Sequence, residues 1–269
     1  MDDSRIQRTA LITGASAGIG TSFAHVFAQH GFDLVLTARR ADRLTDLAQE
    51  IATKYGRRVH VIAADLADPA APAKIFSEIA EAGITVDALV NNAGYGLPGR
   101  FLDCTWDQHR AFIQVMVTAV ADLTRRFLPG MVARRYGRII NVASLAGLVP
   151  ASAGHTLYAA SKSMLVFFSQ SLALEHLQNN VHVTALCPGF TYSEFHDVNG
   201  MRPQVSQLPG WMWMDADTVA RQGYDAVMAG AIVYVNGRVN GAIAVLTRML
   251  PQWFIMRIVK RVARKFRRA

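Results

Sequence analysis

The chain has 269 residues, of which 51% are hydrophobic and 18% charged, a composition typical of one large α/β domain or two small domains. Its 20 glycines and 9 prolines form no collagen period, repeat or low-complexity block, which argues against fibrous, solenoid and linker-rich proteins. The net charge of +8 comes almost entirely from the C-terminus, where seven basic and no acidic residues fall between Arg257 and Arg268. Because the rest of the chain is close to neutral, we expect no nucleic-acid partner.

The cysteines and the chain ends exclude several further classes. Cys104 and Cys187 lie far apart, with no CxxC or Cys/His spacing, and the eight histidines show no HExxH pattern, so we expect no disulfide framework and no metal. Residues 1–8 are polar, and the apolar stretch 242–259 is interrupted by Arg248, Pro251 and Arg257. These features predict a cytoplasmic protein without a signal peptide or a membrane span.

Short apolar runs alternate with longer amphipathic segments along the chain. Strands are expected near residues 10, 33, 59, 86, 137 and 181, with a last one at Ala231 to Val235. Helices are expected between them, for example at Ser22 to His30, Arg43 to Tyr55 and Pro72 to Ala82. Strands that are apolar throughout are buried on both faces, so the pattern predicts an α/β protein with a parallel sheet between two helical layers.

No Pro/Ser-rich linker divides this pattern. We therefore expect a single domain over residues 1–237, which includes a substrate lid at 194–217, and a C-terminal helical extension over 238–269.

A glycine-rich loop joins the first predicted strand to the first helix. It runs from Thr13 to Gly20 as TGASAGIG. Glycines allow a tight turn and a close approach of the backbone to a pyrophosphate, whose charge is stabilised by the N–H groups and dipole of the following helix. The position of the loop between strand and helix predicts a dinucleotide-binding site.

The residues at the end of the second predicted strand indicate which of the two nicotinamide cofactors is bound. A carboxylate there would bind the ribose 2′-hydroxyl of NAD, whereas a basic residue neutralises the 2′-phosphate of NADP. Here the sequence has Arg39 and Arg40, and no carboxylate occurs before Asp42. We expect NADP(H), with Arg39 as the main phosphate ligand and Ser16 as a helper; the alternative is a pair of solvated arginines at the start of a helix.

Tyr158 and Lys162 are four residues apart, so they share one face of a helix. An ammonium close to a phenol favours the phenolate, which lowers the tyrosine pKa from about 10 towards neutrality and allows proton transfer. Ser144, at the end of the fifth predicted strand, is placed to hydrogen-bond the same carbonyl oxygen.

Together, the loop TGASAGIG, the segment NNAG, Ser144, the segment YAASK and Pro188-Gly189 closely resemble the short-chain dehydrogenase/reductase family, over about residues 7 to 235. The resemblance implies a Rossmann-type, doubly wound parallel sheet and an NAD(P)-dependent oxidoreductase acting on an alcohol or carbonyl, usually as a homodimer or homotetramer. It implies Tyr158 as the acid/base, Lys162 on the nicotinamide ribose and Ser144 on the substrate oxygen. The remaining residues that it assigns to the cofactor are Gly14, Ser16, Gly18, Ile19, Gly20, Asp65, Leu66, Asn91, Ala93, Gly94, Pro188, Gly189 and Thr191.

One residue departs from the family pattern. The family usually carries an asparagine in the helix after NNAG, and Met116 stands at that position. A thioether is a poor hydrogen-bond partner, so a proton relay through Lys162 needs another route, for which Gln114 and Thr118 are candidates.

The substrate is expected to be apolar, because the lid region carries Phe195, Trp211 and several methionines. These side chains could instead pack the lid onto the body. Steroid-like ketones, 3-oxoacyl chains and hydrophobic aldehydes all fit an apolar lid. His155, three residues before Tyr158, is either a substrate contact or an ordinary loop histidine.

The C-terminal tail has a basic face and an apolar face at helical spacing. Residues 252–268 could therefore lie on an anionic membrane surface, or their apolar stripe could pack on the protein itself or on a partner copy. Two functions remain open at this point: an NADPH-dependent carbonyl reductase, or a weakly catalytic NADPH-binding protein with a regulatory or membrane-associated role.

Overall fold

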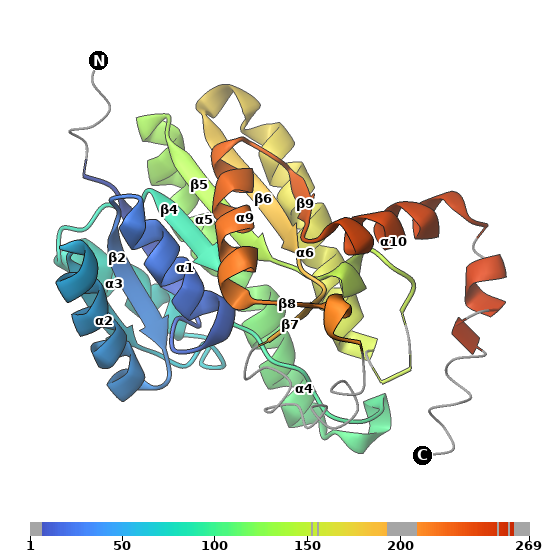
Figure 1. Cartoon of the computed structure of the whole chain (residues 1–269). Coiled ribbons are helices and arrows are strands. Elements are labelled where there is room, and N and C mark those ends of the chain that lie inside the picture. Colours follow the sequence, from blue (N-terminus) through green and yellow to red (C-terminus); the bar gives the residue numbers. More distant parts are fainter. Residues whose placement is uncertain are drawn as a thin grey trace.

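A computed structural model of the chain describes residues 7–151, 153–154, 156–192, 209–251, 253–257 and 259–260. Within these residues, seven parallel strands form one sheet in the order β3-β2-β1-β4-β5-β6-β9 (Figure 1). The strands are β1 (Thr9–Thr13), β2 (Asp33–Ala38), β3 (Val59–Ala63), β4 (Ala88–Asn91), β5 (Gly137–Val142), β6 (Val181–Cys187) and β9 (Val233–Val235). The predicted parallel sheet is confirmed, although its last strand begins two residues later than expected.

Helices cover both faces of the sheet, which confirms the predicted three-layer, Rossmann-type architecture (Figure 1). One face packs against α1 (Gly18–Gln29), α2 (Ala41–Tyr55) and α9 (Ala216–Met228). The other packs against α3 (Ala71–Glu81), α5 (Ala119–Arg134) and α6 (Thr156–Glu175). The elements outside these layers are η2 (Phe101–Asp103), α4 (Trp106–Ile113), η3 (Gln114–Thr118), η4 (Leu145–Gly147), η5 (Leu177–Asn179), β7 (Phe190–Thr191), η6 (Gly210–Met212), β8 (Trp213–Met214) and α10 (Arg238–Met249).

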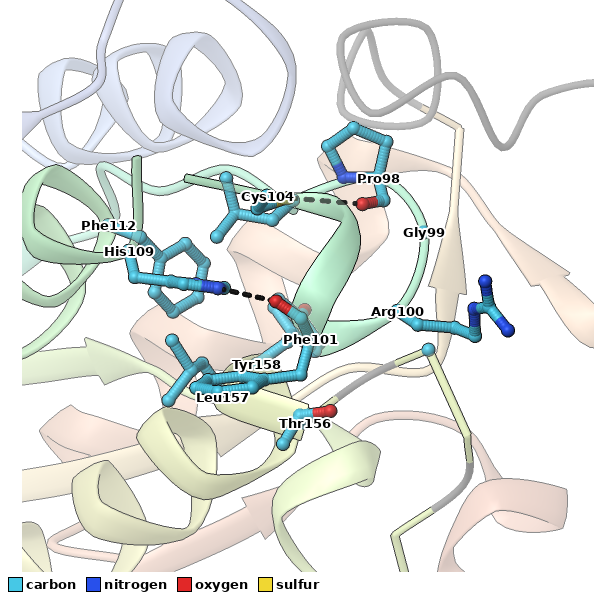
Figure 2. A pocket seen from close by; sticks show the side chains of 12 residues that line it. Pro98, Gly99, Arg100, Phe101, Cys104, His109, Phe112, Thr156, Leu157 and Tyr158 are labelled. Carbon is cyan, nitrogen blue, oxygen red and sulfur yellow. Dashed lines mark hydrogen bonds between the residues drawn. The ribbon is translucent and has the colours of Figure 1, made fainter. Parts of the chain in front are cut away.

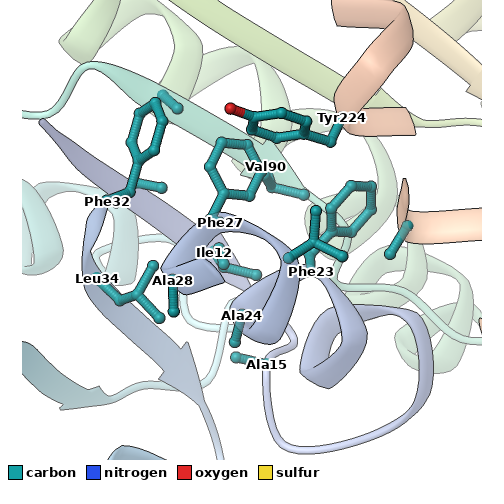
Figure 3. Close-up of a cluster of buried hydrophobic side chains, with 14 of the residues drawn as sticks. Ile12, Ala15, Phe23, Ala24, Phe27, Ala28, Phe32, Leu34, Val90 and Tyr224 are labelled. Carbon is teal, nitrogen blue, oxygen red and sulfur yellow. The ribbon is translucent and has the colours of Figure 1, made fainter. Parts of the chain in front are cut away.

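The core on the α1 side shows why these residues fold together. Phe23 and Phe27 lie on one face of α1 and are fully buried (Figure 3). The ring of Phe27 packs edge-on against Tyr224 of α9, with centroids 5.1 Å apart. Aromatic side chains of this size contribute about 1.5–3 kcal/mol each when buried. The contact holds α1, and therefore the glycine-rich loop at its start, firmly against the sheet.

The strand order reverses direction between β1 and β4, both of which are central. β1 pairs on one side with β2 and on the other with β4. The loops that follow β1 and β4 therefore turn to opposite faces and leave a crevice at the carboxyl ends of the strands, where ligands bind in open α/β sheets. At or near this edge lie the glycine-rich loop, the NNAG segment, Ser144, the YAASK segment and Pro188-Gly189.

The chain continues beyond β9 into α10, which projects to one side of the body (Figure 1). The helix starts after Gly237, whose φ of +83° is a left-handed conformation that suits glycine. Asn240 in its first turn bonds the Asn236 carbonyl at 2.8 Å and lies against Gly189. Among the described residues, no helix has both the length and the apolar character needed to cross a membrane.

Candidate active site

A cavity of about 830 Å³ opens at the carboxyl ends of the strands. Its walls come from the glycine-rich loop, the ends of β2 and β4, the segments after β5 and β6, and the helices α6 and α10. The structure thus brings together most of the residues predicted from sequence: Gly14, Ser16, Gly18, Ile19, Arg39, Asp65, Leu66, Ala93, Gly94, Ser144, Tyr158, Lys162, Pro188, Gly189 and Thr191 all line it.

The glycine-rich loop has the geometry of a phosphate cradle. Gly14 and Gly18 have φ angles of +66° and +55°, and a Cβ on Gly14 would lie 2.8 Å from the Ala93 Cα. Ala17 occupies the N-cap of α1 and provides no side-chain hydrogen bond to the first turn. The backbone N–H groups of this turn therefore have no side-chain cap. Gly18 and Ile19 at the start of α1 line the cavity, which suits a pyrophosphate.

Gly20 has a structural part in this loop. It does not line the cavity, and a Cβ at this position would lie 2.2 Å from the Gly14 carbonyl oxygen and 2.7 Å from Asn92 Nδ2. Only a residue without a side chain lets α1 approach the loop this closely. The cofactor contact expected of Gly20 is thus indirect, through the position of the helix.

Two arginines line the cavity at the end of β2. Arg39 and Arg40 both contribute to the wall, and Arg40 reaches across to the glycine-rich loop. Its Nε and Nη2 atoms donate to the Ser16 hydroxyl at 3.3 and 3.2 Å, and Nη2 also donates to the Ser16 carbonyl at 3.2 Å. The sequence favoured Arg39 with Ser16 as helper. The structure adds Arg40, whose guanidinium lies beside Ser16 and suits a phosphate.

Ser144, Tyr158 and Lys162 converge on one wall of the cavity. Ser144 follows β5, and its hydroxyl hydrogen-bonds the Tyr158 phenol. Lys162 lies one turn further along α6, buried, with its Nζ 5.7 Å from the centroid of the tyrosine ring. The predicted shared helix face is therefore present.

The expected effect of Lys162 on the tyrosine pKa was wrong. Burial raises the pKa of Tyr158 to about 12, and the hydrogen bond from Ser144 offsets only part of this rise. Lys162 donates its hydrogen bond to the Val142 carbonyl at 2.7 Å rather than to the phenol, and burial lowers the pKa of the ammonium to about 8. Tyr158 is thus fully protonated at neutral pH, which suits the donation of a proton.

Asn91 lies behind the cavity wall rather than on it. Its side chain is buried at the end of β4, where Nδ2 donates to Asn141 Oδ1 at 2.8 Å and to Thr124 Oγ1 at 3.2 Å. Asn141 in turn donates to Ser169 Oγ at 2.9 Å. This buried polar chain links β4 and β5 to α5 and α6, so Asn91 fixes the helix that carries Tyr158.

The residues around Met116 form a π-helical turn, η3, between α4 and α5. Met116 is 1% exposed and packs beneath Gly94, where a Cβ would lie 2.8 Å from its sulfur. Neither Gln114 nor Thr118 lines the cavity, and Thr118 is exposed to solvent. The two alternative relay residues suggested by the sequence therefore lie outside the site.

The lid region contributes a different side chain from the one expected. Trp211 is 67% exposed and does not line the cavity, whereas its neighbour Met212 does. Both belong to the single turn η6, in which successive side chains point about 120° apart, so they cannot face the cavity together. His155 and Phe195 lie outside the described residues.

Tyr158 also lines a smaller hollow of about 20 Å³ (Figure 2). His109 of α4 forms part of its wall, and its Nε2 lies 2.8 Å from the Phe101 carbonyl oxygen. The imidazole also stacks on the Phe101 ring, with centroids 4.5 Å apart. These contacts attach η2, before α4, to the helix.

Sequence reasoning missed several wall residues. Tyr95 follows directly on Gly94, so the NNAG motif could have found it. Arg40 was noted beside Arg39 but was not assigned to the phosphate. Asn240 and Ile243 come from α10, outside the stretch that carries the motifs, and no sequence signal marks them. Among the residues that the structure describes, no group of three or more His, Cys, Asp or Glu side chains could hold a metal ion.

A cavity of this size over a doubly wound sheet, with a phosphate cradle at one end and a Ser-Tyr-Lys group at the other, defines an oxidoreductase that uses a nicotinamide dinucleotide. The chain belongs to the short-chain dehydrogenase/reductase family, since a family model described as short chain dehydrogenase matches residues 8–201.

Individual relatives support this membership. Oxidoreductase UcpA of Escherichia coli strain K12 is 39% identical over 183 residues, which cover 68% of this chain and 69% of UcpA. The 3-oxoacyl-[acyl-carrier-protein] reductase FabG of Aquifex aeolicus is 33% identical over 239 residues, covering 86% and 96% of the two chains. Among solved structures, a short-chain dehydrogenase from Sphingobium yanoikuyae in complex with NADPH has a TM-score of 0.79 at 31% identity, covering 91% of this chain and 96% of that one.

Proposed function

We propose that the chain is an NADP(H)-dependent carbonyl reductase that interconverts an apolar ketone or aldehyde and its alcohol. The observation that carries the proposal is the single cavity lined by both the arginine end and the Ser144–Tyr158–Lys162 wall. The NADPH complex of the similar Sphingobium enzyme supports the choice of cofactor. When bound, the nicotinamide supplies the hydride that reduces the carbonyl carbon.

The chain's own residues account for the rest of the reaction. The Ser144 hydroxyl orients the substrate oxygen and also contacts the Tyr158 phenol. Tyr158 donates its proton to that oxygen as negative charge develops, and its pKa of about 12 keeps the proton available throughout the neutral range. The buried Lys162 ammonium stabilises the resulting phenolate, and it would also hold the nicotinamide ribose of a bound cofactor.

An apolar substrate suits the wall opposite the phosphate cradle. Leu145, Val149, Phe190, Met212 and Ile243 all line this part of the cavity. An apolar group that leaves water for such a surface gains about 25 cal/mol per Å². The name of the relative FabG, a 3-oxoacyl reductase, is compatible with the 3-oxoacyl class among the candidates.

The cofactor preference is expected to depend on Arg39 and Arg40. Replacement of both by serine should weaken NADPH binding by about 10- to 100-fold and leave NADH binding little changed, since a charged hydrogen bond to phosphate contributes about 1.5–3 kcal/mol. Fluorescence titration with each cofactor measures the two affinities. The single variants Arg39→Ser and Arg40→Ser show how much each arginine contributes to NADPH binding. The control Lys54→Ser removes one positive charge at the far end of α2. Equal losses for NADPH and NADH would contradict the assignment.

Met116→Asn is expected to raise the rate of carbonyl reduction and to lower the melting temperature. The amide can order the water that a relay through Lys162 needs, but it also replaces a fully buried thioether. Steady-state rates and thermal unfolding measure the two effects. Met116→Leu, which keeps the apolar volume, should show no rate gain; a Met116→Asn enzyme no faster than wild type would show that no relay passes through this position.

We further propose that the protein works in the cytoplasm as a homodimer or homotetramer, with residues 1–237 as its catalytic domain and peripheral membrane contact through residues 252–268. The alternative of a weakly catalytic regulatory protein gains no support from the described site, in which Ser144, Tyr158 and Lys162 are all in place.

The direct test of the proposed function is a titration with NADPH and NADH, followed in the same sample by a panel of apolar ketones and aldehydes. Tight NADPH binding with oxidation of the cofactor by at least one carbonyl is the expected result. Failure to bind either cofactor would overturn the proposal.

A further inference from the structure

The outer face of α10 carries a continuous apolar stripe. At 100° per residue, Val239, Ala242, Val245, Leu246 and Met249 fall within an arc of about 120°. All five are exposed, Met249 to 76%. Exposed apolar residues that are grouped in this way, rather than scattered singly, mark an interaction surface.

Two exposed aromatic residues follow α10 in the next described part of the chain. After Pro251, residues 253–257 are helical, with Trp253 69% and Phe254 40% exposed. The two rings meet edge to face with centroids 5.8 Å apart. We call Val239, Ala242, Val245, Leu246, Met249, Trp253 and Phe254 the extension surface. Tryptophan and phenylalanine on such a surface suit the boundary between lipid headgroups and acyl chains.

The positive charge of this part of the chain favours an anionic bilayer over a second copy of the chain as the partner of the extension surface. After Asp225 the remaining 44 residues contain nine Lys or Arg and no Asp or Glu. A second copy of the same surface would bring like charges together, which costs free energy. An anionic bilayer instead attracts each basic residue near its surface by about 1 kcal/mol, and seven of the nine fall between Arg257 and Arg268.

The inner face of the same helix forms part of the active site. Asn240 and Ile243 line the cavity, and Asn240 lies against Gly189 after β6. Ala244, between them and the body of the protein, is buried. One helix therefore separates the substrate cavity on its inner face from the extension surface on its outer face.

We propose that the extension surface docks on an anionic lipid bilayer and that the carbonyl substrate is a molecule dissolved in that bilayer, which enters the cavity past α10. The second half of the proposal rests on the proposed reductase function. Docking places the apolar wall of the cavity next to the acyl chains, so a poorly soluble ketone or aldehyde reaches Tyr158 without crossing water.

Docking is tested by co-sedimentation of the full chain with phosphatidylcholine vesicles, with and without phosphatidylglycerol. We expect binding to the anionic vesicles only, weakened by high salt, and at least tenfold weaker binding for Leu246→Ser/Met249→Ser and for Trp253→Ser. The matched control Trp106→Ser removes a tryptophan that is 64% exposed on α4. Unaltered melting temperatures establish that each variant is folded.

Three results would overturn docking: no binding to anionic vesicles, binding that the extension variants leave unchanged, or light scattering showing that the extension surface joins two copies in solution. Loss of vesicle binding by Trp106→Ser to the same extent would equally remove the assignment to α10.

Substrate delivery is tested with two carbonyls, a short water-soluble aldehyde and a long-chain ketone held in the vesicles. Anionic vesicles should speed oxidation of NADPH by the ketone at least tenfold, and the extension variants should lose that gain while they reduce the soluble aldehyde at the wild-type rate. A ketone rate that is independent of docking would overturn delivery from the bilayer. No turnover of either carbonyl, with vesicle binding intact, would refute the reductase function and leave docking standing.

Discussion

Tyr158→Phe should lower the rate of carbonyl reduction by about 10²- to 10⁴-fold, the usual contribution of a positioned general acid. At about 1.4 kcal/mol per factor of ten, this corresponds to about 3–6 kcal/mol of lost transition-state stabilisation. The substitution removes only the hydroxyl that contacts Ser144, and it retains the ring, which lines both the cavity and the smaller hollow. The loss should therefore appear in kcat and not in the fold.

Single-turnover oxidation of bound NADPH by a carbonyl substrate measures this effect directly. NADPH titration of the same variant should give an affinity close to that of the wild type, because the phosphate cradle and the arginines are untouched. Tyr55→Phe on α2, which removes a phenol hydroxyl far from the cavity, is the matched control. Undiminished turnover in Tyr158→Phe would show that another group protonates the substrate.

Gly20→Ala should weaken cofactor binding at least tenfold. The new Cβ would lie 2.2 Å from the Gly14 carbonyl oxygen, which is backbone and cannot rotate away. Either α1 or the loop must move, and overpacking of this kind costs about 1–3 kcal/mol of stability. The pyrophosphate site depends on the position of the loop relative to the start of α1. We therefore expect the Kd for NADPH to rise at least tenfold, a loss of about 1.4 kcal/mol of binding free energy.

Thermal unfolding and NADPH titration together test this expectation. The control is Gly241→Ala in α10, where nothing lies within 4 Å of an added Cβ and the helical backbone accepts a side chain. Helix propensity should make this control neutral or up to about 1 kcal/mol more stable. Wild-type affinity in Gly20→Ala would mean that the close approach of α1 to Gly14 has no bearing on the cofactor.

The sheet and most of the site could be predicted because they follow from local patterns. Apolar runs mark strands that are buried on both faces. Gly14 belongs to a short motif directly after such a strand, and Tyr158 and Lys162 belong to a short motif on a helix. Parallel strands bring their carboxyl ends to one edge of the sheet, so motifs that are distant in sequence must meet there.

The remaining features depend on packing that no short motif encodes. The Tyr158 pKa rises because the effect of burial exceeds that of the Ser144 hydrogen bond, and Lys162 bonds the Val142 carbonyl instead of the phenol. Met212 lines the cavity and Trp211 does not, because successive side chains of the 3-10 turn η6 point in different directions. Asn240 and Ile243 reach the site only because the chain turns back after β9, and nothing in the motifs indicates that return.

The central strands of the sheet pair with strands that are synthesised much later. Ala10 of β1 pairs with Ala88 of β4, and β6, which comes much later in the chain, pairs with β5. Contacts of such long sequence separation form late and slowly. While β6 is still inside the ribosome, the segment after β6 that carries Pro188 and Gly189 is also missing, so the cofactor site is incomplete. The edge of β5 that later pairs with β6 is then unpaired. During this interval the exposed edge is open to wrong pairing and to chaperones.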